Sequence, residues 1–319
     1  MQNVGIHGLP EGTTALLGRT LQKMKDFLLF FEEKEGTSAM MRWADRFENV
    51  QVVHHQNGRG WEPLEPFLLG RDVKQNEVEE LLNLIYSRPR DLQALRDAYR
   101  IKVPGRKLVP LDSEVSVGLK MRWKPPRVLH VGTDVVDLPV NRLFKRQRYR
   151  VYREYMVEML HENGVVPMLA VRQNIFKWAL SKYHGDGTGK RGHLQFLLAS
   201  GAMSREDIPK IHVNLRRFGR LVDLCRRKHD NKREFVEWMN SRGLEVKPLI
   251  YESFLEDPVN FFGGFLEAIG HDWTKQNIQS VLEQDIELKR VHSGKLSEYV
   301  ENHQELEEAY GLSFESWTV

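Results

Sequence analysis

Residues 27–31, Phe-Leu-Leu-Phe-Phe, form a continuous apolar run, which is typical of a parallel strand buried on both faces. Residues 165–171 form a second such run and residues 244–251 a third. Helical patterns separate the runs, at residues 151–163 and 215–240. Because strands alternate with helices, the sequence predicts an α/β fold with a mostly parallel sheet and helices on both faces.

The first 31 residues predict a further strand and a crossover. Residues 3–7 have strand character, residues 8–12 have turn composition, and apolar residues recur at helical spacing over 13–24. With the run at 27–31 they predict a right-handed βαβ unit. A glycine turn that ends in a helix directs backbone N–H groups and the helix dipole at an anion. The same residues would also suit an ordinary turn with a threonine N-cap.

Composition restricts the class of protein. Of 319 residues, 41% are hydrophobic and 29% charged, which excludes a disordered or fibrous chain. The single cysteine excludes a disulfide framework and a cysteine-rich zinc site. Without a signal-peptide pattern or an apolar run of about 18 residues, the chain is predicted to be cytoplasmic. A net charge of +3 argues against a general nucleic-acid binder.

A second anion site is predicted after the apolar run 165–171. Arg172 would stand at the carboxyl end of that strand, where open α/β sheets bind ligands. Ser181 lies two turns into the following helix and could face the same crevice. An arginine and a hydroxyl suit a phosphate monoester, although a surface arginine would fit the pattern as well. The Gly189-Lys190 pair does not belong to a nucleotide P-loop, because His184 stands where that pattern has its first glycine and Arg191 where it has a hydroxyl residue. We therefore expect residues 185–190 to form a flexible loop.

Taken together, these segments resemble the sulfotransferases that use 3′-phosphoadenosine 5′-phosphosulfate (PAPS), with the spacing of bacterial carbohydrate-type members. The segment of this family that grips the 3′-phosphate is matched by Arg172 and Ser181, and residues 117–121 and 251–270 are similar to two other family segments. The family's Pro-x-x-Gly-Thr-Thr loop, which holds the 5′-phosphosulfate, is matched one residue short by Pro10, Gly12, Thr13 and Thr14. The late loop that closes over the nucleotide is matched by Arg290, Ser293, Gly294 and Lys295.

The resemblance implies one P-loop-like α/β domain over residues 1–319, with a large helical or irregular insertion at 36–126 that binds or covers the acceptor. It covers nearly the whole chain except residues 36–115. It implies transfer of a sulfonate group from PAPS, as co-substrate and without a metal, to a hydroxyl of a carbohydrate, glycolipid or small molecule. Nucleic acid is not an expected partner, and no membrane span is expected.

The family usually carries a basic residue directly after the loop proline, and here that position is Glu11. A carboxylate there would repel the sulfonate, so another cation is expected to take its place. Lys120 and Lys145 are the candidates, and Lys120 is the one predicted to be catalytic.

The family often uses a glutamate after the second strand as general base. Glu33 and Glu35 lie at the carboxyl end of the run 27–31 and are predicted to include this base. The residues themselves leave the choice between the two open. His54 and His55 are alternative bases.

Two other functions remain open on the sequence alone. A nucleotide-dependent kinase would use the same phosphate-binding chemistry, but the chain lacks a Gly-Lys-[Ser/Thr] loop. A polyanion or nucleic-acid binder would use residues 142–150, where basic and aromatic residues alternate. The same run also suits a solvated helix face.

Overall fold

The structure is a computed structural model that describes residues 24–55, 82–83, 85–86, 101–102, 115–122, 154–187, 204, 207, 210–283 and 295–310. Within these ranges, no helix combines the length and the apolar character that crossing a membrane requires.

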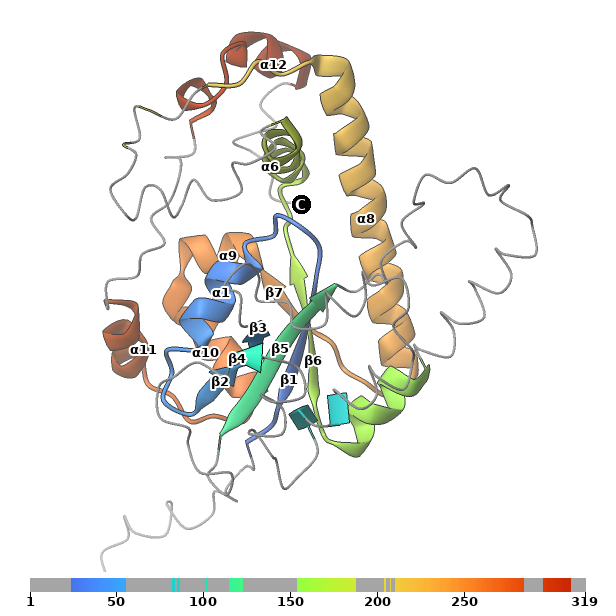
Figure 1. Cartoon of the computed structure of the whole chain (residues 1–319), viewed down its shortest axis with the longest axis vertical. Helices are drawn as coiled ribbons and strands as arrows, with labels where there is room; N and C mark the ends of the chain where they lie inside the picture. The colour runs from blue at the N-terminus through green and yellow to red at the C-terminus, as the bar shows by residue number, and fades with distance from the viewer. Residues whose placement is uncertain are drawn as a thin grey trace, which may run out of the picture.

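Five parallel strands form the central sheet, in the order β2-β5-β1-β6-β7 (Figure 1). They are β1 (Phe27–Phe31), β2 (Val50–Val52), β5 (Ser116–Arg122), β6 (Val166–Val171) and β7 (Lys247–Ile250). A separate antiparallel pair consists of β3 (His54–His55) and β4 (Ile101–Lys102). The predicted parallel α/β sheet is therefore confirmed, and each of the three apolar runs contains one of its strands.

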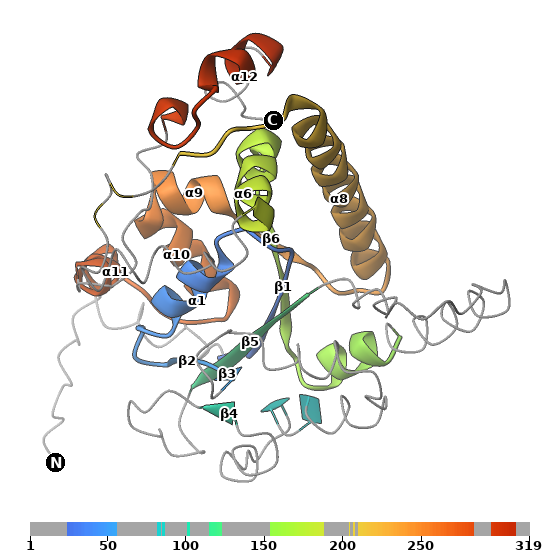
Figure 2. The same ribbon diagram turned by 45° about the horizontal axis from the view of Figure 1, so that its top comes forward.

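β1 is the middle strand, and its continuous apolar sequence follows from burial on both faces. Leu28 and Phe30 pack on the face covered by the helix at 154–162 and the carboxyl half of α8 (Leu215–Ser241). Phe27 and Leu29 pack on the opposite face, against α1 (Thr37–Ala44) and α10 (Pro258–Ala268). α11 (Lys275–Leu282) adds to that second layer, and Figure 2 shows the two layers on either side of the sheet.

A glycine in β5 makes room for a large side chain of β1. A Cβ atom at Gly118 would lie 2.0 Å from Cζ of Phe27, which is closer than any real contact. Gly118 and Phe27 are also register partners in the parallel ladder. The glycine of residues 117–121 is therefore explained by packing within the sheet.

A third apolar cluster lies beyond the carboxyl end of the sheet. α6 (Ile175–Gly187) follows β6 and packs there against the amino half of α8 (Figure 1). The segment with η1 (Leu296–Glu298) and α12 (His303–Tyr310) covers this cluster. A short parallel bridge between Ile211 and Val300 ties that segment down.

Two predicted boundaries differ from the structure. α6 runs through Gly187, so residues 185–187 form its last turn, where a flexible loop was predicted for 185–190. Within the segment 36–126, which was assigned to an insertion, α1, β2 and β5 belong to the main sheet and its covering layer. The strand predicted at 3–7 and the turn at 8–12 lie outside the described residues.

Candidate anion-binding site at the carboxyl edge of the sheet

The strand order reverses between β1 and β6, at the carboxyl ends of these two strands. After β1 the chain moves to β2 on one side of the sheet, and after β6 it moves to β7 on the other side. Open α/β sheets bind ligands where the strand order reverses in this way. The residues at this point are 32–36, called here the β1–α1 loop, and 172–174.

The β1–α1 loop has a shape that few sequences can adopt. Lys34 and Gly36 both have left-handed backbone angles, with φ of 68° and 73°. A Cβ atom at Gly36 would also lie 2.2 Å from Cε2 of Tyr251, so close packing requires a glycine there as well. Gly36 provides no side chain to cap α1. Turns with left-handed residues and uncapped helix starts present backbone N–H groups to anions.

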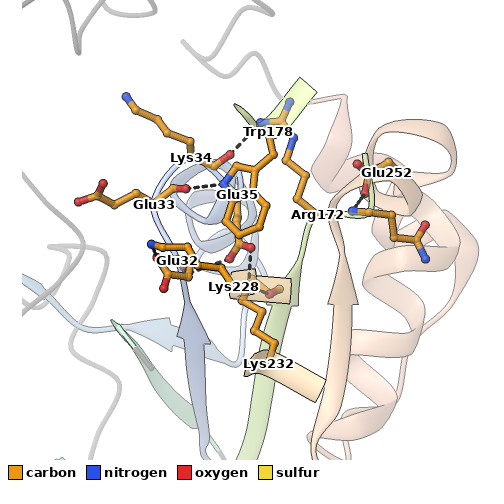
Figure 3. Close-up of polar contacts among 11 residues, drawn as sticks. Glu32, Glu33, Lys34, Glu35, Arg172, Trp178, Lys228, Lys232 and Glu252 are labelled. Carbon is orange, nitrogen blue, oxygen red and sulfur yellow. Dashed lines mark hydrogen bonds and ion pairs between the residues drawn. The ribbon is translucent and has the colours of Figure 1, made fainter. Parts of the chain in front are cut away.

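Two side chains from the segment after β6 hold consecutive carbonyl groups of this loop. Arg172 donates from Nη1 to the carbonyl oxygen of Lys34 at 2.8 Å, and Trp178 donates from Nε1 to that of Glu33 at 2.8 Å (Figure 3). Arg172 also stacks on the ring of Tyr251, 4.8 Å from its centroid. The left-handed conformation of Lys34 costs about 1–2 kcal/mol, and these two hydrogen bonds offset it.

Two ion pairs connect the loop to α8. Lys232 bonds to the carboxylate of Glu35, and Lys228 bonds to that of Glu32. The first pair is deeply buried, with side-chain exposures of 3% for Lys232 and 0% for Glu35. Burial raises the pKa of Glu35 and lowers that of Lys232, and the attraction within the pair opposes both shifts. Burial would also raise the pKa of Glu32, but the neighbouring lysines, chiefly Lys228, hold it below its usual value.

Further cations surround the same loop. Lys120 of β5, only 1% exposed, donates from Nζ to Oγ of Ser38 at 3.0 Å, in the first turn of α1. Lys182 of α6 lies 3.7 Å from the carboxylate of Glu33. Basic side chains on and around the loop outnumber its glutamates; the basic set is Lys34, Lys120, Arg172, Lys182, Lys228 and Lys232, and the glutamates are Glu32, Glu33 and Glu35. This surplus of positive charge suits an anionic ligand.

The segment after β7 completes the edge of the site. Glu252, in the first turn of α9 (Tyr251–Glu256), accepts hydrogen bonds from the backbone N–H groups of Gln173 and Asn174 at 2.9 and 3.0 Å. Its carboxylate therefore occupies the amino end of α6 and joins the loops that follow β6 and β7. Sequence reasoning assigned Tyr251 and Glu252 no role, although both directly follow a buried strand at its carboxyl end.

The structure brings four of the predicted site residues together. Glu33, Glu35 and Lys120 lie at or beside the β1–α1 loop, and Arg172 contacts it. Ser181 is half-buried on α6, three residues after Trp178, whose Nε1 donates to the carbonyl oxygen of Glu33.

Lys295 lies farther along the chain, exposed at the start of η1. This segment approaches the site through Tyr299. Burial raises the pKa of Tyr299 to about 12, and the nearby guanidinium of Arg172 acts against that shift.

The other predicted site residues lie outside the described residues. They are Pro10, Gly12, Thr13, Thr14, Arg290, Ser293 and Gly294, together with Glu11 and Lys145. His54 and His55 form β3, and the structure describes only their backbone.

Sequence reasoning selected Glu33 and Glu35 of the β1–α1 loop as candidate bases but did not recognise the loop itself as an anion-binding turn. The run 27–31 was taken as a second strand, so the glutamates after it were interpreted as candidates for a base. The signal that indicates an anion loop is Gly36-Thr37-Ser38, placed between a buried strand and an apolar helical stripe.

Comparison with known proteins gives a limited result. No protein-family model matches the chain, and no curated protein matches it. Among solved structures, the chain is similar to the crystal structure of sulfotransferase STF9 from Mycobacterium avium, with 12% sequence identity and a TM-score of 0.34. That alignment covers 93% of this chain and 77% of the other.

Proposed function

We propose that this chain is a PAPS-dependent sulfotransferase and that the β1–α1 loop with the start of α1 holds the 5′-phosphosulfate. The observation that carries the proposal is the contact between Arg172 and Lys34. It joins the arginine that matches the family's 3′-phosphate segment to a loop at the switch point of the sheet. One bound molecule with a phosphate at each end could contact both.

The loop also fits the family's sequence pattern better than Pro10–Thr14 does. In Glu33-Lys34-Glu35-Gly36-Thr37-Ser38, a glycine and two hydroxyl residues follow a basic residue at the family's spacing. Glu33 stands where the family has proline, and Ser38 stands where it has the second threonine. Lys34 takes the basic position, so the difficulty posed by Glu11 does not arise.

In the proposed reaction, the acceptor hydroxyl attacks the sulfur of PAPS in line with the departing phosphate oxygen. The sulfur–oxygen bond to the phosphate breaks, and adenosine 3′,5′-bisphosphate leaves. Lys34 and Lys120 would stabilise the charge that develops on the bridging oxygen. Backbone N–H groups at the start of α1, with the hydroxyls of Thr37 and Ser38, would hold the phosphosulfate.

The hydroxyl proton requires a base, and Glu33 is the better of the two predicted glutamates. Its side chain is 48% exposed, so an acceptor could reach its carboxylate. The carboxylate of Glu35 is buried and bonded on both oxygens. Arg172 donates one of its five N–H groups to Lys34, which leaves others for the 3′-phosphate with Ser181. The Nε of Arg172 is buried and has no hydrogen-bond partner in the described part of the chain.

A thermal-shift series tests the proposal. Adenosine 3′,5′-bisphosphate should raise the Tm clearly more than AMP, because only the former carries the 3′-phosphate. Radiolabelled sulfonate should then pass from PAPS to a carbohydrate hydroxyl. Equal shifts by the two nucleotides contradict the proposal. A shift with ATP and Mg²⁺ alone would indicate a kinase, and a salt-sensitive shift with heparin alone would indicate a polyanion binder.

A further inference from the structure

The carboxylate of Glu35 joins three parts of the fold that are far apart in the chain. One oxygen, Oε2, accepts a hydrogen bond from the backbone N–H of Glu32 at 2.7 Å. The other, Oε1, is bonded to the ammonium group of Lys232, which also donates to the carbonyl oxygen of Ala170 in β6. Figure 3 shows Lys232 rising from α8 beneath the loop.

This arrangement acts on the backbone of the loop. The N–H of Glu32 is the first amide after β1, and Glu35 directly precedes the left-handed Gly36. Glu35 therefore connects the two ends of the loop. Lys232 fixes the position of the loop relative to β6, because it bonds both to Glu35 and to the carbonyl oxygen of Ala170. The pair lies on the side of the loop that faces the sheet, whereas Lys34 points outward (Figure 3).

A buried ion pair contributes little net stability to a fold. Removing two charges from water costs several kcal/mol per ion, and apolar side chains of similar size often stabilise a fold as well or better. The neighbouring pair of Lys228 and Glu32 is more exposed, at 19% for the lysine. The hydrogen bond that closes the loop is accepted by Glu35, whose carboxylate is also bonded to Lys232.

We infer that Lys232 and Glu35 are positioning residues that hold the β1–α1 loop in the shape that binds the phosphosulfate of the donor. Lys232 acts through Glu35, and neither residue touches the donor. The inference rests on the proposed function of the loop. It adds that the binding geometry is set from α8, through a carboxylate that accepts a backbone hydrogen bond.

Two double variants separate the hydrogen bond from the charges. In E35Q/K232M both charges are removed, but the glutamine carbonyl can still accept the N–H of Glu32. In E35L/K232M both charges and the acceptor are removed, and apolar groups fill the space. E35Q/K232M should keep a Tm near that of the wild type, because it leaves no buried charge unpaired and keeps an acceptor for the N–H of Glu32. E35L/K232M should have a somewhat lower Tm, because that N–H loses its acceptor. K247M serves as the control for loss of a lysine away from the loop, since Lys247 lies at the amino end of β7 and pairs with the exposed Glu245.

Calorimetric titration with adenosine 3′,5′-bisphosphate gives the first measurement. E35L/K232M should lose roughly tenfold or more in affinity, the size expected for one charge-assisted hydrogen bond. E35Q/K232M should bind within about threefold of the wild type, and K247M should do the same. Equal affinity in all three variants would overturn the inference and leave the proposed function intact. If E35L/K232M does not fold, E35D replaces it in the experiment. The aspartate keeps the negative charge, but its side chain is one methylene shorter, so the acceptor no longer reaches the N–H of Glu32. E35D should therefore also lose affinity.

Hydrogen exchange of the peptide that contains residues 32–36, measured without ligand, gives the second measurement. Exchange should be faster in E35L/K232M or E35D than in the wild type and near normal in E35Q/K232M. This result does not depend on any nucleotide. Failure of the wild type to bind adenosine 3′,5′-bisphosphate would contradict the proposed function. Hydrogen exchange would then still test whether Lys232 and Glu35 hold the loop. Unchanged exchange in E35L/K232M or E35D would refute that role.

Discussion

Nη1 of Arg172 lies 2.8 Å from the backbone carbonyl oxygen of Lys34, although 138 residues separate the two along the chain. The contact joins the loops that follow β1 and β6, where the strand order reverses. The sequence patterns indicated these two loops separately, and the contact shows that they lie together in the fold. The site can therefore be tested with single substitutions at either segment.

Replacing Arg172 with alanine should weaken binding of adenosine 3′,5′-bisphosphate by about 2–3 kcal/mol, because a charge-assisted contact is lost. Arg172→Lys keeps the charge but not the planar fork, so it should recover only part of the affinity. Calorimetric titration of both variants measures this. Binding of AMP should change less than binding of the bisphosphate, and equal losses would contradict a role in reading the 3′-phosphate.

Replacing Lys34 with glycine should separate stability from activity. Glycine adopts the left-handed conformation without strain, so the free energy of unfolding should stay the same or rise by up to about 1 kcal/mol. Turnover of sulfonate should fall by about 10²–10³-fold, because the ammonium group is lost. Urea unfolding and initial-rate measurements test the two parts. Lys34→Asn, which also tolerates this conformation, should reproduce the loss, and a fully active glycine variant would exclude Lys34 from catalysis.

Replacing Lys120 with methionine keeps much of the side-chain length and removes the cation next to Ser38. We expect turnover to fall by about tenfold or more, and by more than in Ser38→Ala, which removes one hydroxyl. Initial rates at saturating PAPS measure the effect. Lys247→Met is the matched control, since Lys247 lies at the amino end of β7 and pairs with the exposed Glu245. Equal rates in the Lys120 and Lys247 variants would assign Lys120 to packing alone.

Replacing Gly36 with alanine should destabilise the protein in two ways. The left-handed angle costs about 1–2 kcal/mol, and the new Cβ atom would collide with the ring of Tyr251. Gly164 has a similar φ of 61° but open space around it, so Gly164→Ala carries the first cost without the second. Urea unfolding should show a clearly larger loss for Gly36→Ala. If the two losses were equal, Tyr251 would have to move aside freely.

The buried thiol of Cys225 predicts sensitivity to base. Burial raises its pKa from the ordinary 9.0 to about 11, although nearby cations, first among them Lys182, act against this. A pKa that is higher in the folded state stabilises the fold below pH 9, and this contribution is lost as pH rises to about 11. Urea unfolding at several pH values should show the decline, and Cys225→Ala should reduce it. An identical decline in the variant would assign the effect to other groups, such as Tyr299.

The elements of the fold were predictable where burial is continuous or periodic along the chain. The run at Phe27–Phe31 and the helix at Leu215–Ser241 carry such patterns, and both are present almost as predicted. The order of strands was less accessible, because it depends on which apolar faces meet in space. The phosphosulfate loop was predicted before Phe27–Phe31, at Pro10–Thr14, so Gly36, Thr37 and Ser38 were not selected.

The candidate site was predictable only in part. Arg172 could be placed because it directly follows a buried strand. Lys228 and Lys232 could not, because lysines four residues apart on a basic helix usually face water. Only the assembled fold shows that they turn inward toward Glu32 and Glu35. Glu252 was missed for the same reason, since its partners are backbone amides of a distant segment.

The ion pairs between α8 and the β1–α1 loop also have a consequence for the order of folding. Their partners are 196 and 197 residues apart, so their formation requires closing a very long stretch of chain. Contacts of such high sequence separation form slowly compared with the helices and neighbouring strands. During synthesis β1 leaves the ribosome long before α8. The glutamates of the β1–α1 loop can therefore pair with Lys228 and Lys232 only after α8 has been made. The newly made protein should therefore acquire its secondary structure well before it becomes competent to bind an anion.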